Sequence, residues 1–265
     1  MPKKDILISG YSRYVDVLEK NKTCIEYMPF RWVPSQDSYN IIEDGGMKKL
    51  LFLETSREHA NDLANIVNEL ISVERQLRTW IFVIEEFPGK GDKHSILFEF
   101  ILPLAERSLL LPYTIQARFY FSMAQISHQA NLMTNRTSTD NLSTLPLDQA
   151  ISQEIASSVA KSWKYKRKLL SAIEKINSRE FQENTRSFRN IYTHRHWPGI
   201  EIGSSKSTYR SPNSNNASYS ISAPSPLKLS EIVPEVERQC EASKKAYSML
   251  QKLVREQIAA AGIAA

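Results

Sequence analysis

Apolar side chains recur at helical spacing over most of this chain. After Thr55-Ser56-Arg57-Glu58, which has the spacing of a capping box, apolar residues fall three or four positions apart as far as Pro88-Gly89. The positions that carry this pattern are Leu63, Val67, Leu70, Leu77, Ile81 and Ile84. The residue before a proline is biased away from helical backbone. The pattern therefore predicts one long helix that ends near Phe87.

A second helical stretch is predicted to begin near Ser95. Pro103 and Pro112 should kink or split it, because proline lacks the amide hydrogen that an interior helical turn uses. Residues 113–134 are expected to continue as a long helix. The side chains expected to face inward there are Ile115, Phe119, Ile126 and Met133. Residues 135–145 are polar and predict a loop.

Helical spacing returns over residues 147–176 and again near the C-terminus. The first of these stretches is defined by Ile151, Ile155, Val159, Trp163, Leu170 and Ile173. Ser178 is suited to cap a further helix, which must end by Trp197 because a proline follows. Residues 199–229 are rich in Ser, Asn and Pro and indicate a long mobile loop. Ser230 can cap a final helix with an apolar face formed by Val236, Cys240, Tyr247, Leu250 and Val254.

Residues 1–55 do not share the helical pattern. Residues 41–43, an Asp-Gly turn and residues 47–53 predict a small hairpin, and residues 24–33 could form another strand. An irregular lead-in packed on a helical body would explain the same residues. The expected fold is all-α: an antiparallel bundle of four to five long helices over residues 56–265, with a small β-hairpin or irregular embellishment over residues 1–55.

Composition narrows the protein class. The chain has 265 residues, 42% of them hydrophobic and 24% charged, which excludes wholesale disorder. Only 8 residues are glycine, and this disfavours a doubly wound dinucleotide fold. Two cysteines, Cys24 and Cys240, are too few for a disulfide scaffold or a thiolate zinc site. No apolar window is long enough to cross a membrane. A cytoplasmic protein without metal or cofactor is expected.

The positive charge is concentrated in one part of the chain. Residues 161–196 hold ten basic and three acidic side chains, a net charge of +7, so that the overall charge of +5 leaves −2 for the remainder. Such a segment is typical of a polyanion-binding surface. Its expected RNA-binding residues are Lys164, Lys166, Arg167 and Lys168. A solvated helix face would produce the same run of lysines.

The candidate chemistry lies within this basic segment, at residues 186–196. On a helix, Asn190 and His194 would share a face, and Arg186 would join them. Arginine presents a planar donor fork that fits phosphate, and histidine exchanges a proton near neutral pH. Together they suit cleavage of an RNA phosphodiester, because one group moves the 2′-hydroxyl proton while a cation stabilises the charge on phosphorus. The chain contains no HExxH motif, paired carboxylate cluster or Walker loop.

A helical bundle with Arg189-Asn190-Ile191-Tyr192-Thr193-His194 late in the chain resembles the HEPN superfamily, whose signature is Arg-x(4–6)-His. The resemblance implies a metal-independent endoribonuclease that leaves a 2′,3′-cyclic phosphate. It also implies a homodimer in which two motifs face each other. Family members often act as toxins or in defence, commonly with a neutralising antitoxin partner. On this resemblance, Arg189 would bind the scissile phosphate, His194 would act as acid/base or position the substrate, and Asn190 would orient them.

Other interpretations of these residues remain open. His196 also satisfies the family spacing from Arg189, although His194 is favoured because it shares a face with Asn190. Arg186 and Arg195 are auxiliary candidates. A non-catalytic helical module could use the same basic face to bind RNA or a protein partner. Alternatively, Arg189 and His194 could be structural and tie down a helix end, where cations are favoured by the helix dipole. The loop at 199–229 would cover the site or be disordered.

Overall fold

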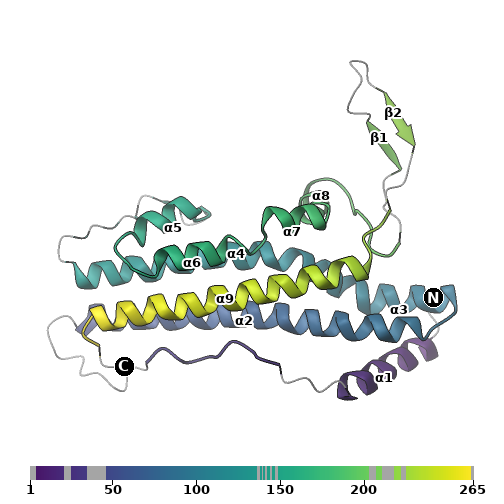
Figure 1. Cartoon of the computed structure of the whole chain (residues 1–265), viewed down its shortest axis with the longest axis horizontal. Coiled ribbons are helices and arrows are strands. Elements are labelled where there is room, and N and C mark those ends of the chain that lie inside the picture. Colours follow the sequence, from purple (N-terminus) through teal and green to yellow (C-terminus); the bar gives the residue numbers. More distant parts are fainter. Residues whose placement is uncertain are drawn as a thin grey trace. The chain divides into compact units, whose positions relative to one another are not determined.

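The computed structural model describes residues 4–20, 25–34, 46–135, 138, 140, 142–143, 145–146, 149–202, 207–210, 218–221 and 225–263. Most of these residues are helical (Figure 1). The elements are α1 (Lys4–Lys20), α2 (Gly46–Glu85), α3 (Lys90–Ile96), the π-helix η2 (Leu97–Ile101), α4 (Leu102–Thr134), α5 (Gln153–Val159), α6 (Lys166–Ile173), α7 (Arg179–Asn184), α8 (Phe188–His194), β1 (Thr208–Arg210), β2 (Tyr219–Ile221) and α9 (Leu229–Ala260). The all-α fold class is confirmed.

Three of the described helices have more than 30 residues: α2 has 40, α4 has 33 and α9 has 32. The end of α2 agrees with the prediction, but its start does not. Residues 46–54 precede the expected capping box and are already helical, so the strand predicted over residues 47–53 is wrong. Phe52 and Leu53 are buried there, which explains why this apolar run is part of the helix. Residue 55 therefore marks no boundary between elements. The rest of the predicted hairpin, at residues 41–45, lies outside the described residues.

The N-terminal region also differs from its prediction. Residues 4–20 form the helix α1, which the sequence analysis missed. Residues 25–34 form no strand, and their irregular course agrees with the alternative of a lead-in packed on a helical body. Among the described residues, the strands are β1 and β2, which pair antiparallel with Tyr209 opposite Ser220. They lie within the predicted loop at residues 199–229.

The prolines act differently from one another. The π-helix η2 lies just before Pro103. Proline has no amide hydrogen to donate to a carbonyl of the preceding turn, and the helix is wider at that turn. Pro112 is accommodated inside α4 and does not split it. The helix predicted over residues 147–176 is instead two short helices, α5 and α6, with a turn around Trp163. Ser152 caps α5, since its side chain accepts from the amide of Ile155 at 3.3 Å.

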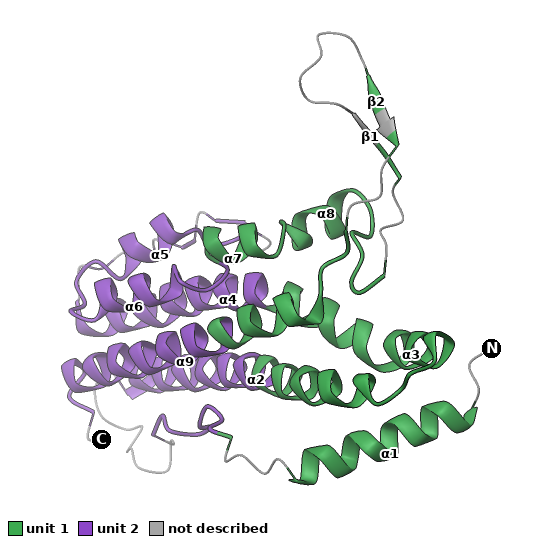
Figure 2. Ribbon diagram, turned by 45° about the vertical axis from the view of Figure 1, so that its right-hand side comes forward, with its two compact units in different colours: residues 1–25, 70–111, 178–238 green, residues 26–69, 112–177, 239–265 purple. Residues whose placement is uncertain are grey.

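The described residues form two compact units (Figure 2). Unit 1 comprises Met1–Ile25, Leu70–Leu111 and Ser178–Arg238, and unit 2 comprises Glu26–Glu69, Pro112–Asn177 and Gln239–Ala265. In unit 2, segments of α2, α4 and α9 pack around fully buried Leu63, Phe119 and Leu250. Gln257 of α9 donates to Ser127 of α4 at 3.1 Å inside this core. Gln116 of α4 donates to the Ile176 carbonyl at 2.5 Å and holds the end of α6 against the core.

Residues 26–34 form an extended strap on unit 2. Met28 and Val33 of the strap are buried. Its backbone is held by side chains of α2, since Asn68 bonds Met28 and Arg57 Nη2 donates to the Pro34 carbonyl at 2.7 Å. The Arg31 amide donates to Asn61 Oδ1 of α2, and the Pro29 carbonyl accepts from the Tyr247 hydroxyl of α9. These side-chain bonds take the place of a neighbouring strand.

Unit 1 is built around a stack of aromatic rings. Tyr14 of α1 lies 4.6 Å from the Trp80 ring on α2, and Trp80 lies 5.0 Å from Phe100 on η2. Gly10 allows α1 to approach closely, because a Cβ there would come within 3.1 Å of Ile96 Cδ1. These contacts hold α1, the end of α2, α3 and η2 together in the unit that also contains α8, the helix of the candidate motif.

Candidate functional site

The candidate motif lies on α8, a seven-residue helix in unit 1. The single helix predicted from Ser178 is wrong. Ser178 does cap α7, because its side chain accepts from the Phe181 amide at 3.3 Å, but the chain leaves the helix at residues 185–187. Arg186 and Ser187 both adopt left-handed backbone with φ of 53°. Arg186 is therefore not one helical turn before Asn190, and the predicted shared face of these two residues does not form.

The Arg186 side chain instead fastens the turn to the start of α9. Its Nη2 donates to both carboxylate oxygens of Glu231, at 2.9 and 3.2 Å, and its Nη1 donates to the Ser225 carbonyl at 2.6 Å. The amide of Lys228, and to a smaller extent the Arg186 guanidinium, hold the pKa of Glu231 below its ordinary value. The contacts of Arg186 thus support the turn that positions α8.

One carboxylate on α4 anchors both α8 and the residues that follow it. Phe188 is buried and stacks on Tyr192 with ring centroids 5.5 Å apart. The Tyr192 hydroxyl donates to Glu106 at 3.4 Å, and the Trp197 indole donates to the same carboxylate at 2.8 Å. The Glu106 charge raises the pKa of Tyr192. Sequence reasoning missed Glu106, because no local motif marks a residue 86 positions from its partner.

The motif side chains lie on the outer part of this anchored helix. Asn190 and His194 are exposed, and because both lie within α8 four residues apart they share a face. Arg189 is half-buried and donates from Nη1 to Asn190 Oδ1 at 2.9 Å. This bond places the Arg189 guanidinium beside the Asn190 amide, on the helix that also carries His194. Together these side chains can present a cationic fork and an exchangeable proton to a phosphate.

The two other auxiliary candidates lie beyond the end of α8. Arg195 is exposed and follows the last helical residue, while His196 is half-buried. The amides of both residues donate to the Ile191 carbonyl, at 2.9 and 3.1 Å, and so close the helix. His196 consequently does not continue the face that carries Asn190. Of the two histidines, His194 is the one placed on that face.

The basic segment is divided between the two units. The cations over residues 161–175 belong to unit 2, whereas Arg179, Arg186, Arg189 and Arg195 belong to unit 1. Lys164, Arg167 and Lys168 are exposed and Lys166 is half-buried. Trp163, a member of the apolar series predicted over residues 147–176, is half-buried and donates from its indole to Asn131 Oδ1 at 3.0 Å. The sequence-level sum of +7 is thus not the charge of a single helix face.

The lysines around α6 are arranged about an aromatic ring. The ammonium groups of Lys164 and Lys168 lie 5.9 and 5.8 Å from the Tyr165 ring centroid. The Glu256 carboxylate of α9 accepts from the backbone amides of Lys164 and Tyr165, at 2.7 and 3.1 Å, and satisfies the amides at the start of α6. This local geometry keeps two cations and a ring together on the surface of unit 2. Among the described residues, the lysines at 164 and 168 have no carboxylate partner.

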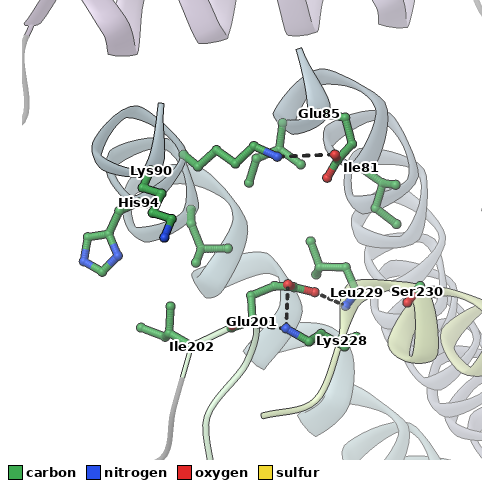
Figure 3. Close-up of a pocket in the computed structure, with 12 residues that line it drawn as sticks. Ile81, Glu85, Lys90, His94, Glu201, Ile202, Lys228, Leu229 and Ser230 are labelled. Carbon is green, nitrogen blue, oxygen red and sulfur yellow. Dashed lines mark hydrogen bonds and ion pairs between the residues drawn. The ribbon is translucent and has the colours of Figure 1, made fainter. Parts of the chain in front are cut away.

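Unit 1 also contains a cavity of about 500 Å³ that sequence reasoning did not find (Figure 3). It lies among the end of α2, α3, residues 201–202 and the start of α9. Its lining mixes aliphatic side chains with lysines and carboxylates. No sequence signal marks it, because its walls come from four separate parts of the chain.

Comparison with known proteins identifies no relative: no family model, curated protein or solved structure matches the chain. Within the described residues, no three His, Cys, Asp or Glu side chains gather in an arrangement that could hold a metal ion. The described helices include none that combines the length and apolar character required to cross a membrane.

Proposed function

We propose that this protein is a metal-independent endoribonuclease of the HEPN type, with α8 as its catalytic helix. The observation that carries the proposal is the hydrogen bond from Arg189 Nη1 to Asn190 Oδ1 on a helix that presents His194 on the same face as Asn190. Phosphodiester cleavage needs a phosphate-binding cation and a proton-transfer group held together. The stacking of Phe188 on Tyr192 and the bonds to Glu106 supply a rigid base for them.

In the proposed reaction, the Arg189 guanidinium binds the scissile phosphate and stabilises the negative charge that grows on its oxygens. The 2′-hydroxyl loses its proton to a base and its oxygen forms a bond to phosphorus. The bond from phosphorus to the 5′-oxygen breaks, and that oxygen takes up a proton. The products are a 2′,3′-cyclic phosphate and a 5′-hydroxyl. The His194 imidazole performs one of these proton transfers, and Asn190 positions the Arg189 fork.

A homodimer completes the proposed site, since each α8 carries one histidine and the reaction needs both a base and an acid. A second motif from the partner subunit would supply the other proton transfer. An antiparallel helical bundle, a cytoplasmic location, a role as toxin or in defence, and a neutralising antitoxin protein belong to the same proposal and rest on the family resemblance.

The decisive experiment is incubation of the purified full chain with RNA in EDTA. We expect cleavage that leaves cyclic phosphate ends, and a loss of about 100-fold or more in Arg189→Ala and His194→Ala, as for removal of a transition-state donor. Arg179→Ala is the matched control, because Arg179 is an exposed arginine of the same unit that pairs with Glu183 on its own helix, α7. RNA that stays intact at high protein concentration, or equal activity in all variants, contradicts the proposal.

A second candidate function is supported by the lysines around Tyr165. Two ammonium groups beside one half-buried aromatic ring suit an RNA backbone with a stacked base. A non-catalytic RNA-binding protein would use this surface without α8. Binding that persists in His194→Ala, with no cleavage by the unsubstituted chain, would favour it.

A further inference from the structure

The cavity of unit 1 has an apolar wall of appreciable extent. Its volume of about 500 Å³ lies within the range of small-molecule sites. The wall consists of five aliphatic side chains: Ile81, Ile84, Leu97, Ile202 and Leu229. Ile84, Leu97 and Leu229 are buried, so these side chains are held by the core of the unit. An apolar group entering the cavity would remove these surfaces from water, and this favours a ligand with an apolar body.

Three lysines and two carboxylates line the same cavity. Lys93 Nζ lies 3.3 Å from a Glu85 oxygen, and Lys228 Nζ lies 3.4 Å from Glu201 Oε2. Both separations exceed the 2.7–2.9 Å typical of a strong charge-assisted hydrogen bond. Figure 3 shows the pair of Lys228 with Glu201, the Glu85 carboxylate and the Lys90 side chain among the lining residues.

The carboxylate of Glu201 has a structural task as well. Its Oε1 accepts from the Leu229 amide at 2.6 Å, at the first residue of α9. It satisfies one of the amides that a helix start leaves without a partner. The Glu201 carboxylate is therefore already bonded within the protein and is not available to pair with a cationic ligand.

Lys90 differs from the other two lysines. It is exposed at the cavity and pairs with no carboxylate within the described part of the chain. His94 follows four residues later on α3 and also lines the cavity, with its ring 4.5 Å from that of Phe98. The lining consequently carries one more positive than negative charge, next to an aliphatic wall.

We propose that this cavity binds a small organic anion, with one or two rings or a short alkyl chain as its body and a single carboxylate, sulfonate or phosphate as its head. The body packs on the aliphatic wall and the head pairs with Lys90. A single charge fits because one ammonium group lacks a carboxylate. Nucleoside di- and triphosphates fit less well, since no arginine lines the cavity and two of its three lysines already face carboxylates.

The test uses two probes with the same ring system and opposite charge, 1-naphthalenesulfonate and 1-naphthylmethylammonium. Titration calorimetry on the full chain at millimolar probe concentration is expected to show one sulfonate bound per chain. The ammonium probe should bind at least about tenfold more weakly, which corresponds to about 1.4 kcal/mol. Equal affinity for both probes, or no binding of either, overturns the proposal.

Variants then locate the site. Lys90→Glu should weaken sulfonate binding by about tenfold or more, a loss equivalent to one charge pair. Ser230→Trp, which places a large ring at an exposed lining position, should abolish it by filling the cavity. Lys161→Glu is the control, because it makes the same charge change at an exposed site in unit 2. Sulfonate binding that survives both cavity variants overturns the proposal, as does binding lost equally in the control.

Discussion

The Asn68 side chain pairs with both backbone polar groups of Met28. Asn68 Oδ1 accepts from the Met28 amide at 2.6 Å, and Asn68 Nδ2 donates to the Met28 carbonyl at 3.1 Å. A residue of α2 thus offers the extended strap the same pair of bonds that a neighbouring β-strand would offer. Because the Met28 side chain is buried at this point, the bonds hold an apolar anchor in place.

Asn68→Ala should destabilise the protein by about 1–3 kcal/mol, because both backbone groups of Met28 would lose their partner where water has limited access. Urea unfolding followed by tryptophan fluorescence measures this, since Trp32 lies in the strap and donates to Tyr247 at 2.8 Å. Lys48→Ala, an exposed change on the same helix, should leave the midpoint unchanged. A midpoint that moves equally in both variants would show that the strap bonds contribute nothing.

Asn190 is expected to act by positioning Arg189. Asn190→Asp keeps an oxygen acceptor for Arg189 Nη1, whereas Asn190→Ala removes it. The alanine variant should therefore lose about tenfold to 100-fold in RNA cleavage, and the aspartate variant should retain more of it. Cleavage rates at saturating RNA measure the difference. Equal losses in the two variants would mean that the amide NH2 group, and not its oxygen, is the one required.

Arg186 is expected to support the site without touching RNA. Its pair with Glu231 is about half exposed, with 46% and 44% of the two side chains accessible, so breaking it should cost at most about 1 kcal/mol of stability. Arg186→Ala should nevertheless speed amide hydrogen exchange in α8, because the turn before it loses its bonds to residues 225 and 231. Glu231→Gln should have the same effect. If α8 exchange is unchanged in both, the turn is held by other contacts.

The lysines around Tyr165 should determine the salt dependence of RNA binding. Each phosphate contact removed reduces the slope of log affinity against log salt by about 1. Lys164→Ala and Lys168→Ala are each expected to reduce this slope in a His194→Ala background, where RNA stays intact. Anisotropy of a labelled RNA over a salt series measures the slope. Lys48→Ala serves again as the control. If the slope changes in Lys48→Ala and not in the two lysine variants around Tyr165, RNA binds at another surface.

Stability should fall in mild acid because of His59. Burial lowers the pKa of His59 from its ordinary value of 6.5, and Ser122 Oγ lies 3.2 Å from its Nδ1. The unfolded chain takes up a proton as the pH falls through 6.5, but the folded chain does so only at lower pH. The stabilisation is therefore present above pH 6.5 and is lost as the pH falls toward the folded pKa.

Urea midpoints measured between about pH 7.5 and pH 5.5 should thus decrease in the unsubstituted chain. His59→Gln, which keeps a polar side chain without this titration, should flatten the decrease over that range. Equal pH dependence in the two proteins would show that another group controls the acid response.

Part of the fold could be predicted from the sequence. The apolar spacing of Leu63, Val67 and Leu70 identified the buried face of α2, and that of Val236, Cys240 and Tyr247 identified the buried face of α9. These predictions held because a helix repeats every 3.6 residues whatever it packs against. The capping serine Ser178 was recognised for a similar reason, since it bonds an amide only three residues away. The motif at 189–194 could also be placed on a helix.

What the tertiary structure decided is where helices break and which side chains meet. The turn at Arg186 interrupts a helix that local pattern favours, and the bond to Glu231, 45 residues away, compensates for its left-handed backbone. Glu106 bonds Trp197 across 91 residues. The cavity beside Lys90 is assembled from four separate segments. Periodicity is a property of neighbouring residues, whereas these features depend on contacts that exist only once distant parts of the chain have packed together.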